Sequence, residues 1–582
     1  MTVFVASTIA LVILIARTDL NFLEWCGLGA ALFVSIARPD FGKSQWRRIS
    51  ARFQMLARRR TLCVIAVGLI ALLLRLAFLP MIPVPEPLVS DEFSHRLLAE
   101  TLLLGRASNP THPMWAHMET IQVIQKPTYA SMYLPGQAIF LAAGKVVAGT
   151  LWAGVALSVA LMCGAICWAL QGWLPPSWAL AGGLIAVARF GLFSYWMNSY
   201  WGGAVAALGG ALVIGAYPRI RNRAGVWSSI VMGVGVALLA VSRPYEGLVL
   251  LLPIAGAMLF WLLRLRGRLL SRACGRVAVP ILCVVVVAGG LLGHYNAHVT
   301  GSPFRLAYTV NQQTYGWPMT LPWFQVKPHT HSVQVMHDYY LWELEEHNKV
   351  ANAPGHIFKN LCDAVSLWSF FAGPSLGVFL VYLPRSLRDR RIRTAVFACG
   401  AGLAAVILEQ TRYPHYLAPA TAAFMVVLLQ SARHMWAHGA RNSPVLHALF
   451  RLIPLVIALV LVARVLVPPL RAFQPGVGRY WSWCCNAPGN LARAALLKQL
   501  EATAGDHLVI VRYGPQHDPL KDWVYNEPQV DRAKVVWARD MGESANRELV
   551  QYFRKRSAWL LEINDDGLRP SLAPYRIENS GG

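Results

Sequence analysis

Apolar residues run along most of this chain in long stretches separated by short polar connections. A helix needs about 20 apolar residues to cross the hydrocarbon core of a bilayer, and fewer where its ends are buried in protein. The pattern therefore predicts an α-helical polytopic membrane protein with about thirteen spans. We place the spans at 3–17, 23–37, 61–80, 151–171, 177–194, 202–217, 226–242, 246–263, 277–293, 365–383, 395–409, 416–431 and 450–468.

The connections between the apolar stretches differ in charge. Four of them together hold 21 basic residues and two acidic ones. These four are 38–60, 218–225, 264–276 and 384–394. Because short cytoplasmic loops collect Lys and Arg, we expect all four on the cytoplasmic side of the membrane. The longer loops 81–135 and 294–364 then face the opposite side.

The number of membrane crossings constrains one further apolar run, 135–147. An odd number of crossings must separate the outer loop from the basic loop at 218, yet four apolar runs lie between them. The run 135–147 is short and is interrupted by Lys145, so we predict a helix lying in the membrane interface. The N-terminus is then cytoplasmic and the C-terminus is outside. The first run lacks a preceding basic stretch and an evident cleavage site, so we expect it to remain as a span.

After about residue 469 the pattern becomes that of a small soluble α/β unit. It predicts helices at 491–504 and 543–556 and strands at 507–513, 534–539 and 558–563. We therefore expect three regions, which are a helical hairpin with a basic cytoplasmic loop (1–60), a transmembrane core (61–468) and an outer α/β domain (469–582). The last region carries no GxGxxG or P-loop motif, so we assign it a binding or structural role.

The composition agrees with a membrane protein and excludes several classes. The chain is 55% apolar and only 14% charged, whereas soluble domains carry about 25% charged residues. Its net charge of +24 is spread over short loops, so it does not indicate nucleic-acid binding. The ten cysteines form no CxxC pair, which indicates neither a disulfide framework nor a zinc ribbon. We do not expect the adjacent Cys484 and Cys485 to bond to each other.

An adjacent acidic pair, Asp91 and Glu92, opens the first outer loop. Ser90 before it is a good helix N-cap, and negative charge in a first helical turn is favourable by about 0.3–1 kcal/mol. The pair therefore suits either a structural cap or a catalytic role. Because neighbouring helical residues point about 100° apart, the two acids are not expected to share one role. We keep both as catalytic candidates and expect that one of them caps the helix.

This acidic pair followed by an interfacial helix resembles the GT-C superfamily of membrane glycosyltransferases. The likeness is greatest to protein O-mannosyltransferases and to the bacterial aminoarabinose transferases of lipid A. It extends over the segments YLPG (133–136), MNSYW (197–201) and RYPHYLAP (412–419), and covers about residues 61–430. In that family the loop aspartate is the candidate general base, and the resemblance implies this role for Asp91.

The chain also departs from these relatives. Met132–Pro135 stands where the aminoarabinose transferases have Lys-Pro-Pro, which leaves Lys126 as the substitute phosphate contact. The segment 415–419 is one residue longer than the His-Tyr-Leu-Pro of the mannosyltransferases. The WWD-type signature of oligosaccharyltransferases is missing, which argues against en bloc glycan transfer to asparagine.

Nucleotide sugars are cytoplasmic, so an enzyme working on the outer face would use a sugar carried on a lipid phosphate. The anionic leaving group needs preorganised cations at the outer headgroup level. The candidate substrate-binding residues are Arg75, Arg189, Arg243, Arg412, Lys126, His95, Tyr413 and His415. Structural alternatives exist, because Arg243 could pair with Glu246, Arg412 could pair with Glu409, and Arg75 could reach the headgroups.

The outer loops are rich in histidine. The residues are His95, His112, His117, His294, His298, His329, His331, His337, His347 and His356. These ligand types would admit a divalent metal, but no HExxH motif or set spacing indicates one. A lipid-phosphate leaving group does not require a metal, and we expect no cofactor. The aromatic and amide residues of 294–327 suit either sugar rings or an interfacial aromatic belt.

We therefore predict a glycosyltransferase of a bacterial inner membrane. It would move a single hexosyl or pentosyl group from a polyprenyl-phosphate donor to a hydroxyl at the periplasmic face, with inversion, and the acceptor would be a glycan, a lipid or a protein. One alternative is a transporter or flippase of a lipid-linked sugar, and another is an assembly partner that acts through 469–582. The absence of inverted sequence repeats disfavours the commonest transporter plans.

Overall fold

The computed structural model describes residues 21–318, 321, 323–326, 328–351, 353–466, 481–485, 487–515, 517–563 and 570–576, with the backbone alone over 351–358. Most of the described chain is helical. The helices of the apolar bundle are α2 (Asn21–Ala37), α4 (Arg60–Ala77), α7 (Leu151–Leu170), α8 (Pro176–Ala186), α9 (Ala204–Arg223), α10 (Val226–Ala240), α11 (Pro244–Leu263), α13 (Val279–Thr300), α16 (Ala353–Phe371), α17 (Gly373–Gly377), α19 (Arg393–Ile407), α20 (Thr421–Asn442) and α21 (Pro444–Leu466).

These helices make the chain a multi-pass membrane protein. Within the described residues, five helices are long and apolar enough to cross a bilayer, or up to six if a bent pair counts as one span. Four more apolar helices are shorter, and one of them is α6 (Gly136–Ala148), where we predicted the interfacial helix. The predicted span 3–17 lies outside the described residues. The other predicted spans fall on the bundle helices, while the total of thirteen stays a prediction.

The predicted span 365–383 differs from a straight helix. The chain bends by 88° between α16 and α17. Gly373 adopts φ +61°, and a Cβ there would lie 2.5 Å from the Arg189 guanidinium. Pro374 follows and has no N–H to continue the α16 hydrogen bonds. A backbone conformation that favours glycine, followed by proline, therefore breaks this segment, which an apolar run alone does not reveal.

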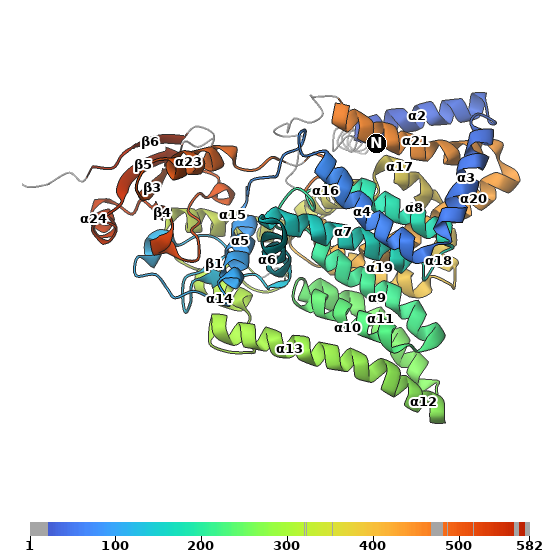
Figure 1. The fold of residues 1–582 in the computed structure, drawn as a ribbon, viewed down its shortest axis with the longest axis horizontal. Helices are drawn as coiled ribbons and strands as arrows, with labels where there is room; N and C mark the ends of the chain where they lie inside the picture. Colours follow the sequence, from blue (N-terminus) through green and yellow to red (C-terminus); the bar gives the residue numbers. More distant parts are fainter. Residues whose placement is uncertain are drawn as a thin grey trace, which may run out of the picture.

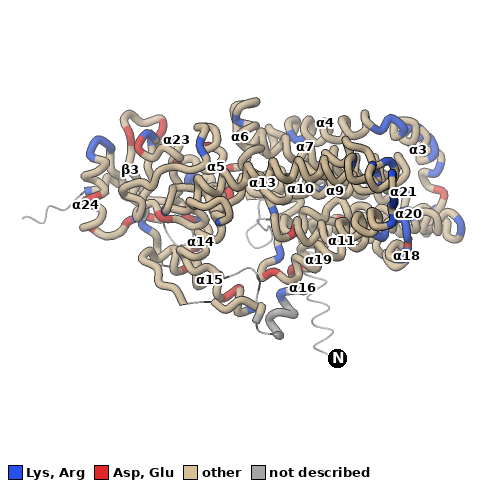
Figure 2. The backbone as a smooth tube through the Cα atoms, turned by 90° about the horizontal axis from the view of Figure 1, so that it is seen from below, with Lys and Arg blue, Asp and Glu red and all other residues tan. Residues whose placement is uncertain are grey.

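The basic connections gather at one end of the bundle. Helices α3 (Lys43–Ala57), α12 (Gly267–Ala273) and α18 (Leu383–Arg388) lie at the right in Figure 1. Lys and Arg colour that end blue when the molecule is turned by 90° (Figure 2). The opposite end carries α5 (Ser90–Leu103), α14 (Ala307–Tyr315) and α15 (Gln334–Ala351). The loops predicted to be cytoplasmic thus lie together, away from the loops predicted to be outside.

Helix α6 lies close against α7. A methyl group on Gly144 of α6 would come within 1.9 Å of the Gly154 backbone in α7. Glycine at both positions lets the two backbones meet directly. This contact fixes α6 on the bundle, and with it the short strand β2 (Ala130–Ser131) and the residues between β2 and α6. Strand β2 pairs antiparallel with β1 (Val123–Ile124).

The C-terminal part forms a four-stranded sheet in the order β4-β3-β5-β6. Its strands are β3 (His507–Tyr513), β4 (Val535–Arg539), β5 (Ser557–Ile563) and β6 (Pro570–Pro574), with helices α23 (Leu491–Ala502) and α24 (Glu543–Tyr552). β3 is parallel to β4 and β5, and β6 is antiparallel to β5. The predicted strands and helices coincide with these elements, whereas β6 was not predicted.

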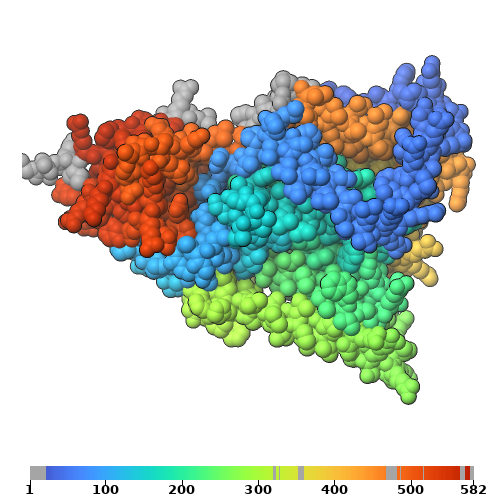
Figure 3. Space-filling model, in the orientation of Figure 1, coloured from blue at the N-terminus to red at the C-terminus, as the bar shows by residue number. Residues whose placement is uncertain are grey.

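This sheet packs on the first outer loop. Phe93 and Leu97 of α5 share one hydrophobic core with Leu508, Ile510 and Val536 of the sheet. The Phe93 and Tyr525 rings stack at 4.3 Å with only 3° between their planes. In Figure 3 the orange and red C-terminal residues lie directly against the blue residues of the outer loop. The loop and the sheet are therefore packed as one unit, although they are far apart in sequence.

Contrary to the expectation from their adjacency, Cys484 and Cys485 are joined by a disulfide. They lie in a tight turn in which the Ser482 hydroxyl accepts hydrogen bonds from both of their backbone N–H groups. This turn brings the two neighbouring sulfurs together, which an extended segment would not do. Cysteines that form no disulfide are Cys26, Cys63, Cys163, Cys167, Cys274, Cys283 and Cys399.

Candidate active site

Glu92 fixes the start of helix α5. Its carboxylate accepts hydrogen bonds from the backbone N–H of Leu88 at 2.7 Å, of Val89 at 3.2 Å and of Tyr200 at 2.9 Å. Burial outweighs these bonds and raises the pKa of Glu92 to about 7. The helix begins at Ser90 with Val89 as the N-cap residue, so Ser90 is not the cap that we expected. Of the two acids, Glu92 thus makes the capping contacts.

Asp91 is half-buried and points to a different set of groups. Its Oδ1 atom accepts a hydrogen bond from the Tyr133 hydroxyl, which lies just before α6. Burial raises the pKa of Asp91 above its ordinary value, although the Tyr133 hydrogen bond and the positive charge of Arg243 act in the opposite direction. A carboxylate with a raised pKa is a stronger base than one in free solution.

Arg243 is the cation whose charge acts on Asp91. It is the N-cap residue of α11 and contacts Glu246 at a long 3.5 Å. Its guanidinium carbon lies 4.6 Å from the centre of the Tyr416 ring. Burial alone would lower the pKa of Arg243, but Glu246 and the tyrosines Tyr416 and Tyr308 outweigh burial and raise it. Arg243 is therefore a permanent positive charge.

His95 lies one helical turn after Asp91, on the same side of α5. Its ring stacks on Tyr133 with centroids 4.3 Å apart. Its Nδ1 atom is buried and has no hydrogen-bond partner among the described residues. Burial and the charge of Arg243 lower the pKa of His95 to about 3. The imidazole is therefore neutral at physiological pH, with a ring nitrogen left for a ligand.

The segment RYPHYLAP (412–419) supplies a second neutral imidazole, that of His415, on which the charges of Arg243 and His95 act. His415 Nδ1 and the Tyr195 hydroxyl are 2.9 Å apart. The His415 ring packs against Trp201 at 4.7 Å and against Tyr413 at 5.5 Å. Burial, followed by the charges of Arg243 and His95, holds the pKa of His415 well below its ordinary value. His415 and Tyr413 thus form one aromatic cluster with Trp201.

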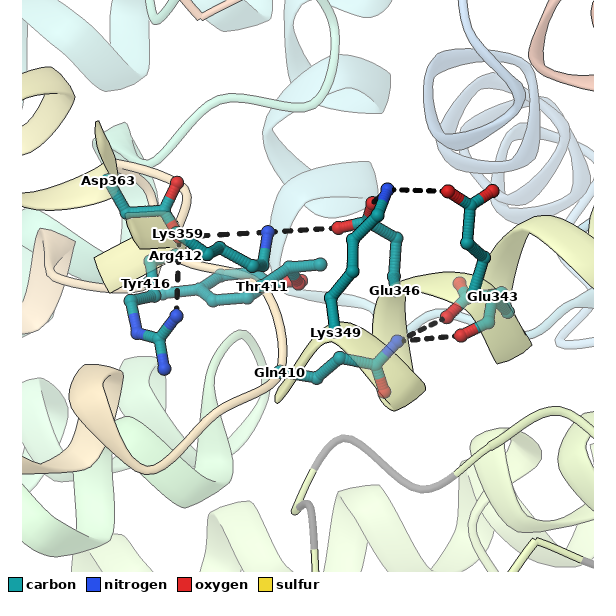
Figure 4. Close-up of polar contacts among 10 residues, drawn as sticks. Glu343, Glu346, Lys349, Lys359, Asp363, Gln410, Thr411, Arg412 and Tyr416 are labelled. Atoms are coloured by element: carbon teal, nitrogen blue, oxygen red, sulfur yellow. Dashed lines mark hydrogen bonds and ion pairs between the residues drawn. The ribbon is translucent and has the colours of Figure 1, made fainter. Parts of the chain in front are cut away.

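Arg412 belongs to a network of charges that joins helices α15 and α16. Its Nη1 atom contacts Asp363 of α16 at 3.3 Å, and its Nη2 atom donates to the Ile407 carbonyl at 3.0 Å. The sequence analysis offered Glu409 as the partner of Arg412. In the structure the partner is Asp363 (Figure 4). Lys359 contacts Asp363 at 3.7 Å and Glu346 at 2.9 Å. Asp363 is thus the carboxylate that Arg412 contacts, and Arg412 shares it with Lys359.

Arg75 is saturated by the protein itself. It is fully buried and donates to Asn198 at 3.0 Å and to the Ile82 and Pro83 carbonyls at 2.9 and 3.2 Å. These bonds tie the end of α4 to the start of the outer loop. The Arg75 guanidinium is therefore bonded to protein acceptors, which leaves it unable to bind a headgroup or a phosphate in the same geometry.

Arg189 is held in the same manner. It pairs with Glu24 of α2 at 2.9 Å and donates to the Phe370 carbonyl at 2.9 Å and to the Ser369 carbonyl. It packs on the Trp483 ring at 3.8 Å. This cation joins α2, the bend after α16 and the 481–485 turn.

Lys126 and the outer histidines lie in other surroundings. Lys126 is exposed and stacks over Trp115 at 4.1 Å. His112 contacts Asp531 at 3.1 Å, and His117 contacts the Arg539 carbonyl at 3.0 Å, so both join the outer loop to the sheet. Within the described chain, no group of three His, Cys, Asp or Glu side chains could hold a metal.

Two features of the site escaped the sequence analysis. Tyr133 lies in the YLPG segment, but nothing in that pattern shows that its hydroxyl meets Asp91. Glu343 of α15 accepts hydrogen bonds from Tyr339 at 2.7 Å and from Gln410 at 3.2 Å. Burial raises the pKa of Glu343 to about 7. The spacing of four between Tyr339 and Glu343 was the available signal.

Asp91, His95, Tyr133, Arg243 and His415 therefore form one electrostatically connected group. It contains one carboxylate of raised pKa, one permanent cation and two neutral imidazoles, enclosed by tyrosine and tryptophan rings. Such a group is able to take a proton from a hydroxyl and to stabilise an anion in partly dehydrated surroundings.

No protein-family model matches this sequence, and no curated protein is similar to it. Solved structures with low sequence identity are similar to this chain. An oligosaccharyltransferase of Archaeoglobus fulgidus, in complex with Zn and sulfate, has 12% identity and a TM-score of 0.47 over 86% of this chain and 68% of its own. ArnT of Cupriavidus metallidurans, solved in the apo state, has 12% identity and a TM-score of 0.46 over 87% of this chain and 93% of its own. ArnT bound to undecaprenyl phosphate has a TM-score of 0.45.

Proposed function

We propose that this chain is a membrane glycosyltransferase that moves a single sugar from a polyprenyl-phosphate donor to a hydroxyl acceptor at the periplasmic face of a bacterial inner membrane. The observation that carries the proposal is the contact set of Asp91. Its carboxylate is half-buried, bonded to Tyr133 and acted on by the charge of Arg243.

In this proposal Asp91 is the general base. The acceptor hydroxyl oxygen attacks the anomeric carbon, the bond from that carbon to the carrier phosphate breaks, and the hydroxyl proton passes to Asp91. One displacement of this kind inverts the anomeric configuration. Positioned base catalysis contributes about 10²–10⁴ to a rate. The raised pKa of Asp91 brings its basicity closer to neutral pH, which supports this role.

Arg243 stabilises the departing phosphate. Its contact with Glu246 is long at 3.5 Å, and its charge acts on Asp91, whereas Arg412 contacts Asp363 at 3.3 Å and donates to the Ile407 carbonyl. Arg243 is therefore the cation whose charge acts on the proposed base, which supports its role at the phosphate. The neutral rings of His95 and His415 orient donor or acceptor hydroxyls, and Tyr413 and Trp201 supply faces on which a sugar ring stacks.

The test uses purified protein in proteoliposomes, a labelled polyprenyl-phosphate sugar and a membrane extract as acceptor source. Asp91→Asn should lower transfer by about 10²–10⁴-fold while the protein stays folded. Asp338→Asn is the matched control, because Asp338 lies on the outer helix α15 and bonds to Gln334. Unchanged transfer by Asp91→Asn would remove Asp91 as the base. Carrier translocation without product would favour a flippase.

A further inference from the structure

An open groove of about 440 Å³ lies between helix α5, helix α23 and the C-terminal sheet. This volume is within the range of about 300–1,000 Å³ that is typical of small-molecule sites. The polar and charged residues that line it are Glu86, Arg96, Glu100, Asn490, Arg493, Lys498, Glu501, Asn526 and Glu527. None of them belongs to the group around Asp91.

The groove uses the opposite face of the helix that carries Asp91. Residues of an α-helix are rotated by about 100° from one to the next. Asp91 and His95 therefore share one face of α5, while Phe93, Arg96 and Glu100 lie on the other. Glu86, which precedes the helix, also lines the groove. The groove thus begins beside the helix end at which Asp91 is located and follows α5 away from it.

The charges of the lining nearly balance. Its four carboxylates come from Glu86, Glu100, Glu501 and Glu527, and its three cations from Arg96, Arg493 and Lys498. Such a surface has no net attraction for a polyanion. Carboxylates and amide oxygens accept hydrogen bonds, while guanidinium, ammonium and amide nitrogens donate them. A neutral chain of hydroxyl groups, which donates and accepts along its whole length, matches this alternation.

One wall of the groove is rigid. Arg493 donates to the Trp523 and Tyr525 carbonyls, each at 3.0 Å. Its guanidinium carbon lies 4.7 Å from the centre of the Phe93 ring and 4.6 Å from that of Trp537. Arg493 therefore joins α5 to the sheet and holds the groove open between them.

The rim is adaptable by contrast. The nearest nitrogen and oxygen of Arg96 and Glu100 are 3.9 Å apart, and both side chains are about one third exposed. Lys498 and Glu501 are exposed on α23. These groups have donors and acceptors left for a ligand, because a pair at 3.9 Å is beyond hydrogen-bond distance.

We propose that this groove binds the non-reacting part of a neutral glycan acceptor. The inference rests on the proposed function and narrows the acceptor from a glycan, lipid or protein to a carbohydrate. The glycan lies along the back of α5 and reaches round the Glu86 end of the helix to present its terminal hydroxyl to Asp91. Helix α5 then serves both binding and chemistry, one on each face.

Direct binding to the full-length protein in nanodiscs tests this proposal without any transfer reaction. The probes are maltohexaose, which is neutral, and hexagalacturonate, which is an anionic chain of the same length. The Arg96→Gln/Lys498→Ala double variant should bind maltohexaose at least about tenfold more weakly, since it loses charge-assisted hydrogen bonds. Lys555→Ala is the matched control, because Lys555 is exposed on the same unit outside the groove. Glu501→Gln, an exposed substitution, is the second variant and should also weaken binding.

Three outcomes separate the two proposals. Equal maltohexaose affinity in the wild type and in both groove variants, or stronger binding of hexagalacturonate, would overturn the groove proposal. Groove-dependent binding combined with no transfer from a polyprenyl-phosphate sugar would keep the groove and overturn the proposed function. Transfer with an acceptor KM that the groove variants leave unchanged would keep the function and overturn the groove. Both proposals together require a raised acceptor KM with an unchanged donor KM.

Discussion

The Tyr133 hydroxyl donates a hydrogen bond to Oδ1 of Asp91, a residue 42 positions earlier in the chain. Tyr133 also stacks on His95 at 4.3 Å and meets Tyr308 edge to face at 5.5 Å. The tyrosine thereby fixes the orientation of the proposed base. It also lowers the pKa of Asp91 in opposition to burial, which raises it.

Tyr133→Phe should therefore shift the acidic limb of the pH profile of transfer. Asp91 acts as a base only when it is ionised, so kcat/KM falls as the pH drops through the Asp91 pKa. Removing the Tyr133 hydrogen bond raises that pKa further, and the limb should move to higher pH. The measurement is kcat/KM between about pH 4 and pH 8. This range runs from the ordinary pKa of a carboxyl group to above that of histidine.

Tyr308→Phe is the control for this shift, because Tyr308 contacts Tyr133 through its ring edge. Its acidic limb should match that of the wild type. His95 does not account for the limb, since its pKa is lowered to about 3. A Tyr133→Phe limb at or below the wild-type position would contradict Asp91 as the titrating base.

Arg243→Gln should lower kcat by about 10²–10³, the effect of removing one preorganised donor from a developing anion. Arg243→Lys keeps the charge without the planar fork, so it should restore part of the activity. Steady-state kinetics with varied donor concentration measure both. Arg305→Gln, an exposed arginine of the outer region, is the control. Full activity of Arg243→Gln would assign the phosphate to another cation.

Glu24→Gln should destabilise the protein strongly. Glu24 and Arg189 form a pair at 2.9 Å whose side chains are 3% and 6% exposed. Removing one partner of a buried ion pair costs about 3–5 kcal/mol, because the other charge stays buried. Thermal unfolding followed by tryptophan fluorescence should show a clearly lower midpoint. Asp40→Asn, which removes an exposed partner of Lys43, should leave the midpoint unchanged.

Asp522→Asn should loosen the sheet from the outer loop. Arg539 pairs with the fully buried Asp522 and also donates to the Glu119 carbonyl at 2.6 Å. Breaking the pair should cost about 3–5 kcal/mol. Burial opposes ionisation, but Arg539, Thr120 and Tyr513 outweigh burial and hold the pKa of Asp522 below its usual value.

The pH dependence of this effect has a definite sign. A lowered pKa in the folded protein contributes stability above the unfolded value of about 3.9, and this stability is lost as the pH falls through the folded pKa. The stability difference between wild type and Asp522→Asn should therefore be largest at neutral pH and shrink in acid. Glu543→Gln, which removes an exposed partner of Arg547, is the control. An equal difference at all pH values would exclude the charge of Asp522 as its cause.

The sequence predicts the bundle well because an apolar stretch in a bilayer has few alternatives to a helix. A pairing predicted from helical spacing is wrong where the helix ends before the two residues. Arg412 and Glu409 have helical spacing, but α19 ends at Ile407, so the spacing does not bring them together. Arg243 and Glu246 do meet, because Arg243 caps α11 and Glu246 lies in its first turn.

The surroundings of Asp91 could not be predicted for a different reason. Tyr133 contacts it from 42 positions along the chain, and the charge of Arg243 reaches it from a third segment, so both depend on how the helices pack. The arginines Arg75 and Arg189 illustrate the same limit. A charged residue near a membrane span indicates a function or a partner, and only the packing reveals that both are satisfied by protein groups.

The stacking of Phe93 on Tyr525 has a consequence for biosynthesis. Helix α5 is made long before the residues that cover its outward face. A product that terminates before Leu508 would still insert all of its described membrane helices, but α5 would lack its backing. Because Phe93 and Leu97 share their core with sheet residues, the outward face of α5 stays uncovered until the much later strands have been synthesised.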